Sequence, residues 1–289
     1  VLDARDGIFD ADGSIFESSI HRNGFQLMDA DSDVVDLANL NQVSSIYLPE
    51  LKRMINQLNP LDKISAVVFW HPMLRGEEFQ LTETGDSECS KNKLRTAPVA
   101  SLAHIDTDIQ AYTVDQLVRL VFNNRVPDDG PGGEASTIFR SALENQRRFA
   151  IWNFWRNAGM EPVRRSPLGI YLPTYPKHEG QPRAFPTSRP DPVQSRWYYY
   201  SDMSPNECLI FKQYDRRVDC VSDLWHCALP LEGHPTDEKR RSFDLRALIV
   251  YEDQLSPSLD RYKSSQSLLS LEESESFCNA QGEQRRQQQ

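Results

Sequence analysis

Three side chains that can ligate a metal ion, His104, Asp106 and His226, are the residues of this sequence most able to do chemistry. His104 and Asp106 form a His-x-Asp pair, and His226 follows 120 residues after the aspartate. Two imidazoles and one carboxylate on one face of an octahedral ion leave three adjacent positions open, which suits a non-heme Fe(II) site that admits a chelating co-substrate and O2. The triad therefore predicts an oxygenase.

The pair alone is weak evidence, because a chain with six histidines and 42 acidic residues contains His-x-acid pairs by chance. His226 lies in the apolar run 224–229, where a single imidazole is often a hydrogen-bonded core residue. Two other functions therefore stay open. One is a Zn(II)-dependent cupin-like hydrolase or isomerase with the same three ligands, and the other is a non-catalytic jelly-roll binding protein with structural histidines.

An arginine-serine pattern after the distal histidine favours the oxygenase. 2-Oxoglutarate chelates iron through its 1-carboxylate and keto oxygen, which leaves a distal carboxylate for a buried arginine to bind in bidentate fashion, with a serine hydroxyl adding one hydrogen bond. Arg240 and Ser242 supply this pair fourteen residues beyond His226. On a regular strand they share one face with Asp244 and Arg246, so we expect Arg240 to be the anchor and Arg246 its substitute. Alternatively, the charged residues of this face are simply exposed to solvent.

The composition narrows the classes of partner. A formal net charge of -10 offers no broad basic surface, so we expect a small-molecule substrate and neither a nucleic-acid nor a membrane partner, and no obligate protein partner is evident. Five cysteines without a C-x-x-C pair argue against a zinc knuckle and a disulfide framework, and favour a cytoplasmic setting. No apolar run approaches the roughly 18 residues of a membrane span.

The order of the expected elements predicts the fold class. Helices are expected over 49–59 and 136–146. A third helix is expected to begin at a capping box formed by Thr113 and Gln116 and to end at residue 122. Strands are expected over 64–70, 149–155, 197–200, 207–214, 224–229 and 242–251, with a loop over 76–96. Strands before and after central helices, without βαβ alternation or a glycine-rich phosphate loop, favour a mainly β double-stranded β-helix (jelly-roll) core with flanking helices.

Two segments are expected to lie outside this regular core. Six prolines between Pro173 and Pro192 rule out a regular element and favour a long loop, either an active-site lid or a solvent-exposed linker. Serine, glutamate and glutamine dominate the end of the chain. We therefore expect a single decorated domain over 1–253 and a mostly disordered polar tail over 254–289.

Several motifs in register resemble a fungal family of hydroxylase/desaturase-like proteins, which includes gibberellin desaturase-like enzymes and a hydroxylase of the aspergillic acid pathway. The resemblance spans roughly 24–253, and the run 67–71 with Arg75 also looks like the early strand of that family. The motifs are Ala-His-Ile-Asp at 103–106, Arg-Arg-Phe-Ala-Ile-Trp-Asn-Phe-Trp-Arg at 147–156, Ser-Pro-Leu-Gly at 166–169, Trp-Tyr-Tyr-Tyr at 197–200, Met-Ser-Pro-Asn-Glu at 203–207, Phe-Lys-Gln-Tyr-Asp at 211–215 and Arg-Arg-Ser-Phe-Asp-Leu-Arg at 240–246.

The resemblance implies oxidation of a small metabolite that depends on Fe(II), 2-oxoglutarate and O2. The chain departs from the family pattern at Asn157, Leu172 and Arg216, which leaves the metal triad intact and the substrate open. Asn153 and Arg156 are polar groups on a mostly apolar strand. They are candidate contacts to co-substrate or substrate, or else they tie down loop backbone. His71 either lines the pocket or ends a strand at the surface.

Overall fold

Two β-sheets form the centre of the molecule. The computed structural model describes residues 1–9, 13–79, 94–106, 108–126, 132–173, 195–217, 221–231 and 238–252. Within these ranges a six-stranded sheet has the order β4-β10-β7-β12-β5-β6, a four-stranded sheet has the order β1-β9-β8-β11, and β2 pairs with β3. The strands are β1 (Leu2–Asp3), β2 (Ile8–Phe9), β3 (Ile15–Phe16), β4 (Phe25–Asp29), β5 (Ile64–Gly76), β6 (Arg95–Ala97), β7 (Phe149–Asn157), β8 (Leu168–Pro173), β9 (Ser195–Tyr199), β10 (Glu207–Asp215), β11 (His226–Ala228) and β12 (Arg241–Tyr251).

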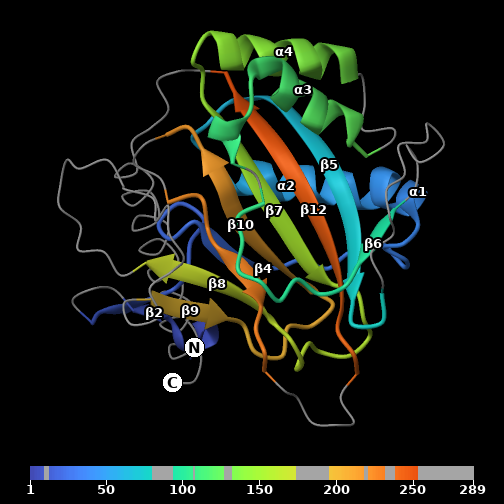
Figure 1. Cartoon of the computed structure of the whole chain (residues 1–289), viewed down its shortest axis with the longest axis vertical. Coiled ribbons are helices and arrows are strands. Elements are labelled where there is room, and N and C mark those ends of the chain that lie inside the picture. The colour runs from blue at the N-terminus through green and yellow to red at the C-terminus, as the bar shows by residue number, and fades with distance from the viewer. Residues whose placement is uncertain are drawn as a thin grey trace, which may run out of the picture.

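Helices lie outside the sheets (Figure 1). One helical stretch covers a face of the six-stranded sheet, and α3 and α4 pack together near one end of its other face. The helical elements are α1 (Leu40–Gln42), the π-helical turn η2 (Val43–Tyr47), α2 (Leu48–Leu58), α3 (Val114–Asn123), α4 (Gly132–Glu144) and the 3-10 turns η1 (Ala4–Asp6) and η4 (Ile109–Ala111). The mainly β jelly-roll core with flanking helices is therefore confirmed. None of the helices in the described ranges is both long and apolar enough to cross a membrane.

Alternation along β7 and β12 sorts their side chains between two environments, since successive residues of a strand point to opposite faces. Phe154, Phe243 and Leu245 pack against the α2 side of the large sheet. On the other face, Phe149 and Leu248 pack beneath α3 and α4. Further along the same face, Asn153 and Arg246 are polar and line a pocket. Beyond them lies the apolar cluster that contacts the small sheet. The sequence thus places a polar pocket between two apolar clusters.

The predicted elements largely agree with the observed ones. The capping box of α3 is present, and β7, β10 and β12 match their predicted strands to within two residues. The strand predicted over 64–70 is longer, because β5 continues through Pro72 to Gly76. Pro72 fits because the pairing of β5 with β12 shifts there, from Trp70 opposite Arg246 to Met73 opposite Asp244. Proline lacks an N–H, and a bulge does not require one.

The last two residues of the loop predicted over 76–96 belong to β6, which pairs in parallel with β5. Cys208 and Cys227 are free thiols, and the other three cysteines lie outside the described residues. The proline-rich loop beyond Pro173 and the tail also lie outside the described residues.

Buried charges join β7 to β10 away from the pocket. The Arg148 guanidinium contacts Asp62 at 2.7 Å and Asp215 at 3.0 Å, and the Lys212 ammonium lies 3.1 Å from Asp215. Burial alone would raise the pKa of Asp215, but attraction by Lys212 and Arg148 lowers it below the ordinary value. The ionised carboxylate is therefore part of the folded structure.

We expect Asp215→Asn to lower the free energy of unfolding by about 3 to 5 kcal/mol, because it leaves buried cations without their partner. The pKa of Asp215 is lower in the folded than in the unfolded chain. Its stabilisation is therefore complete above the unfolded value, about 3.9, and is lost as the pH falls towards the folded value. Urea denaturation at neutral pH measures the loss. Asp115→Asn is the matched control, because Asp115 pairs with Arg140 at an exposed site. Equal midpoints for both variants would contradict the prediction.

Candidate metal centre

Backbone pairing brings His104 next to His226. The His104 amide donates to the carbonyl of His226 at 3.1 Å, and the His226 amide donates to the carbonyl of His104 at 3.0 Å. A third bond, from the amide of Ala228 to the carbonyl of Ala100 at 2.7 Å, extends this contact. The segment 100–104 therefore lies beside β11 as a continuation of the small sheet, and the long sequence gap closes in space. The two imidazole rings are 4.4 Å apart between centroids.

The same local hydrogen bond orients both imidazoles. Nδ1 of His104 lies 2.8 Å from the carbonyl oxygen of Leu102, and Nδ1 of His226 lies 3.2 Å from that of Leu224. A carbonyl oxygen only accepts, so each Nδ1 carries a proton, and in a neutral ring Nε2 then presents a lone pair. This arrangement is usual for metal-ligating histidines, in which the other ring nitrogen donates to a carbonyl or carboxylate.

Asp106 faces both lone pairs. Its carboxylate oxygens lie 3.5 Å from Nε2 of His104 and 3.6 Å from Nε2 of His226. The possible ligand atoms of the three residues all lie within 4.8 Å of one another. Two nitrogen lone pairs and an anionic oxygen repel one another unless a cation sits among them. The three residues are thus fitted to hold a divalent metal ion on one side, with nitrogen and oxygen ligands of the type that iron accepts.

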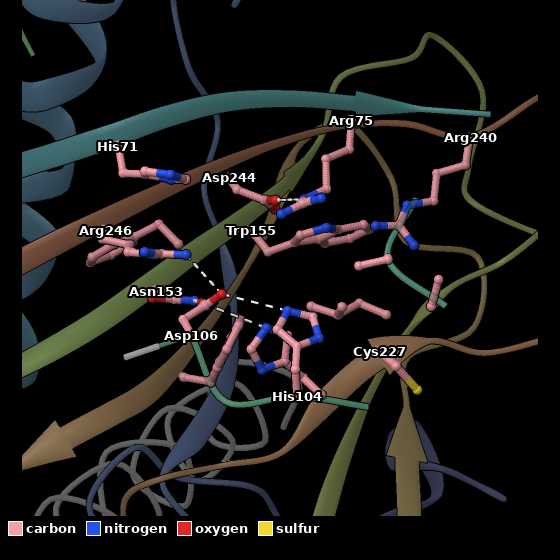
Figure 2. A pocket seen from close by; sticks show the side chains of 16 residues that line it. His71, Arg75, His104, Asp106, Asn153, Trp155, Cys227, Arg240, Asp244 and Arg246 are labelled. Carbon is pink, nitrogen blue, oxygen red and sulfur yellow. Dashed lines mark hydrogen bonds and ion pairs between the residues drawn. The ribbon is translucent and has the colours of Figure 1, made fainter. Parts of the chain in front are cut away.

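Two neighbours hold the Asp106 carboxylate in place (Figure 2). Arg246 on β12 contacts one oxygen at 2.7 Å, and the Asn153 amide on β7 donates a short hydrogen bond to the other. Burial alone would raise the pKa of Asp106, but Arg246 and the two histidines lower it well below its usual value. Burial lowers the pKa of His226, whereas the hydrogen bond with the Asp106 carboxylate raises the pKa of His104, so metal binding at this ring competes with a proton. A charged carboxylate and a neutral imidazole are the protonation states that metal binding requires.

Arg240 is the buried cation at the other end of the pocket. Its guanidinium donates from Nη1 to the carbonyl oxygen of Ser166 at 2.5 Å, and from Nε and Nη2 to the hydroxyl of Ser242 at 3.3 and 3.2 Å. Two of its five N–H groups remain for another partner. Among the described residues no carboxylate forms an ion pair with Arg240, which is 3% exposed. Burial lowers its pKa to about 10, so it stays charged at neutral pH.

The rest of the pocket wall combines polar and aromatic groups. Arg75 forms an ion pair with Asp244 at 2.5 Å, and this pair lies between Arg246 and Arg240 (Figure 2). Trp155 lies against Arg240, whose guanidinium carbon is 4.9 Å from the ring centroid. His71 lines the pocket in a left-handed conformation, with φ of 58°. Burial lowers its pKa to about 3, so its imidazole is neutral. The face of β12 that carries these charges is therefore enclosed, and the solvated alternative is wrong.

The structure brings most of the predicted site residues to one pocket. His104, Asp106, His226, Asn153, Arg240 and Arg246 all line it. Arg156 does not, so its expected contact with co-substrate or substrate is wrong, and it has the other role expected for it, which is to tie down loop backbone. Its guanidinium donates to the backbone carbonyls of Pro205 and Ala30 on the α2 side of the sheet. Asn153 and Arg156 are three positions apart on one strand, so they point to opposite faces. Ser242 does not line the pocket either, so its expected hydrogen bond to the co-substrate is wrong; its buried hydroxyl accepts from the Arg240 guanidinium instead.

Three polar residues near the site were not predicted from the sequence. Arg75 and Asp244 were noted only for their positions, and their ion pair depends on the register between β5 and β12. Gln213, fully buried on β10, accepts a hydrogen bond from the Asp106 amide at 2.8 Å. The available signal was an uncharged polar residue inside the motif 211–215, which follows an apolar run.

Comparisons with known proteins agree with this geometry. A family model described as an oxidoreductase/YMDC permease-like domain matches residues 5–250. The chain is 25% identical over 252 residues to the alpha-ketoglutarate-dependent dioxygenase phiK of Fungal sp., covering 80% of this chain and 79% of that protein. It is 31% identical over 165 residues to the alpha-ketoglutarate-dependent dioxygenase tstK of Talaromyces stipitatus, covering 50% of this chain and 57% of that protein.

A solved structure shares the fold. The iron and alpha-ketoglutarate-dependent endoperoxidase NvfI superposes with a TM-score of 0.51 at 19% identity, covering 81% of this chain and 80% of that one. Alpha-ketoglutarate is another name for 2-oxoglutarate. The resemblance of the sequence motifs to fungal oxygenase-like proteins is therefore confirmed.

Proposed function

Because the chain belongs to the oxidoreductase/YMDC permease-like domain family, we propose that it is an Fe(II)- and 2-oxoglutarate-dependent oxygenase that oxidises a small molecule of fungal secondary metabolism. The observation that carries this function is one pocket with two kinds of site. It holds three metal-ligand side chains within 4.8 Å of one another and a buried arginine without an anionic partner among the described residues. The names of the fungal relatives phiK and tstK support the same chemistry.

Each pocket residue has a role in this proposal. His104, Asp106 and His226 hold Fe(II), and Arg246 and Asn153 fix the orientation of the carboxylate ligand. Arg246 is already paired with Asp106, so Arg240 is the better anchor for the distal carboxylate of 2-oxoglutarate. Its two remaining N–H groups match the two oxygens of a carboxylate.

Fe(II) with bound 2-oxoglutarate supplies the activation of O2. One oxygen atom enters succinate as CO2 leaves, and the other enters the product as a hydroxyl group or departs as water when an alkene forms. Hydroxylation and desaturation thus consume the same amounts of 2-oxoglutarate and O2 and form the same amounts of succinate and CO2. The residues of the chain bind and orient the reactants and exclude water from the reacting carbon.

We also propose that residues 1–253 act as one oxygenase domain. The strands that contribute to the pocket come from both halves of this range, from β5 to β12. Apolar contacts continue from the N-terminal strands into the cluster between the two sheets. A domain boundary anywhere between β5 and β12 would separate residues of this one pocket from one another.

The experiment is to load the purified chain with Fe(II) and measure succinate formed from 2-oxoglutarate in air and without O2. We expect succinate that requires both Fe(II) and O2, because Fe(II) activates O2 and one oxygen atom of O2 enters succinate. A Zn(II)-dependent hydrolase or isomerase is indifferent to oxygen. Succinate formation that is absent from the Fe(II)-loaded chain in air, with candidate fungal metabolites present, would contradict the proposal.

A further inference from the structure

Gln213 joins the two segments that carry the proposed metal ligands. Its side-chain oxygen accepts a hydrogen bond from the Asp106 amide at 2.8 Å, and its side-chain nitrogen donates to the carbonyl oxygen of Leu224 at 3.2 Å. The same Leu224 carbonyl accepts from Nδ1 of His226, also at 3.2 Å. One buried amide therefore contacts the backbone of the carboxylate ligand and the acceptor that orients the distal imidazole.

A β-bulge aims Gln213 in this direction. On β10, Lys212 pairs with Trp152 of β7 and Tyr214 pairs with Ile151, so Gln213 is the extra residue between two pairs. A bulge bends the strand locally and re-aims the side chain of its extra residue, and bulges are frequent next to active sites. Here the side chain points away from the large sheet and contacts the backbone of Asp106 and Leu224, which lies beside the small sheet. A regular strand with the same sequence would not place it there.

The backbone around the bulge strengthens the connection. The amide of Asp223 donates to the carbonyl of Gln213 at 3.2 Å, and the amide of Leu224 donates to the carbonyl of Lys212 at 3.4 Å. Asp223 has a left-handed backbone with φ of 55°, a conformation that is uncommon outside glycine although aspartate adopts it more readily than most residues. The segment before His226 is therefore held against β10 by backbone and side chain together.

We infer that Gln213 is a positioning residue of the metal centre: it sets the separation of Asp106 from His226 through its two hydrogen bonds. It does not contact the metal or the reactants itself. This inference rests on the proposed function for the identity of the three ligands, and it adds a residue that acts on the ligands through their backbone. Partners that only orient metal ligands typically contribute about 10- to 100-fold to metal affinity.

The test is Gln213→Met, which keeps a similar side-chain length and removes both hydrogen bonds. Asn157→Leu is the matched control. Asn157 is another buried amide that joins backbone segments, since its side-chain nitrogen donates to the carbonyls of Glu161 and Met203, but it lies outside the pocket. Both variants should lose stability to urea. Only Gln213→Met should weaken Co(II) binding, by about 10-fold or more, and change the visible Co(II) spectrum.

Each outcome decides the inference. A selective loss of Co(II) affinity in Gln213→Met, with faster hydrogen exchange at the Asp106 amide, supports it. Equal Co(II) affinity in wild type and Gln213→Met, or an equal loss in Asn157→Leu, overturns it. Wild-type protein that binds Co(II) tightly but forms no succinate with Fe(II) in air overturns the proposed function and leaves the role of Gln213 standing. Wild-type protein that binds no Co(II) overturns both.

Discussion

His226→Ala should abolish stable Fe(II) binding and, with it, the formation of succinate. The imidazole of His226 is buried, neutral, and already oriented by the Leu224 carbonyl, so its loss removes one of three ligands without a nearby replacement. Because loss of a partner that merely orients a ligand costs about 10- to 100-fold in metal affinity, loss of the ligand itself should cost more. The iron content per chain, measured after anaerobic loading and desalting, gives the result directly.

His71→Ala is the matched control for this prediction. His71 is another neutral histidine of the same pocket and is partly buried, but it is absent from the group of possible metal ligands among the described residues. Its replacement should leave the iron content unchanged. If His226→Ala alters stability to urea but retains iron at the wild-type level, His226 is a structural histidine and the protein is not the proposed oxygenase.

Arg240→Leu should raise the concentration of 2-oxoglutarate needed for half-maximal succinate formation by about 100-fold. A hydrogen bond to a charged group contributes about 1.5 to 3 kcal/mol, and a bidentate arginine makes two of them, partly offset by desolvation. Arg240→Lys should show an intermediate effect, because lysine keeps the charge and loses the planar pair of donors. Iron binding should not change, since the metal ligands do not contact Arg240.

Arg241→Leu is the control beside it in the sequence. Arg241 is exposed at the start of β12, where it lies 3.6 Å from Glu78 on the outside of the molecule. Its replacement should leave the 2-oxoglutarate dependence as in wild type. A normal dependence in Arg240→Leu would contradict the role of Arg240 as the anchor and would leave Arg75 and Arg246 as the remaining candidate cations of the pocket.

The sequence predicted the residues whose chemistry is specific. The triad of His104, Asp106 and His226 could be found because few residue types ligate iron. Recognising these three residues does not depend on where the strands begin and end. The alternation along 240–246 predicted correctly that polar residues share a face. Period-2 spacing is a local property, so it can be read without knowing the partner strands.

Contacts that depend on pairing register could not be predicted. The bulges at His71 and Gln213 each insert one residue into a ladder, and only the first is marked in the sequence, by the neighbouring Pro72. Arg246 was expected as a substitute anchor, but the pairing of β12 with β7 places it against Asp106. Arg156 was a more avoidable error, because its odd spacing from Asn153 already indicates the opposite face.

The three proposed metal ligands and Arg240 are expected to hold Fe(II) and 2-oxoglutarate together in one pocket. The most direct measurement is an anaerobic titration of the wild-type chain with Fe(II) followed by 2-oxoglutarate, observed by visible absorption. Chelation of ligated Fe(II) by the keto acid should give a weak charge-transfer band that saturates at one equivalent per chain and is absent from His226→Ala. If the band does not form although both Fe(II) and 2-oxoglutarate are in excess, the proposed co-substrate site is contradicted.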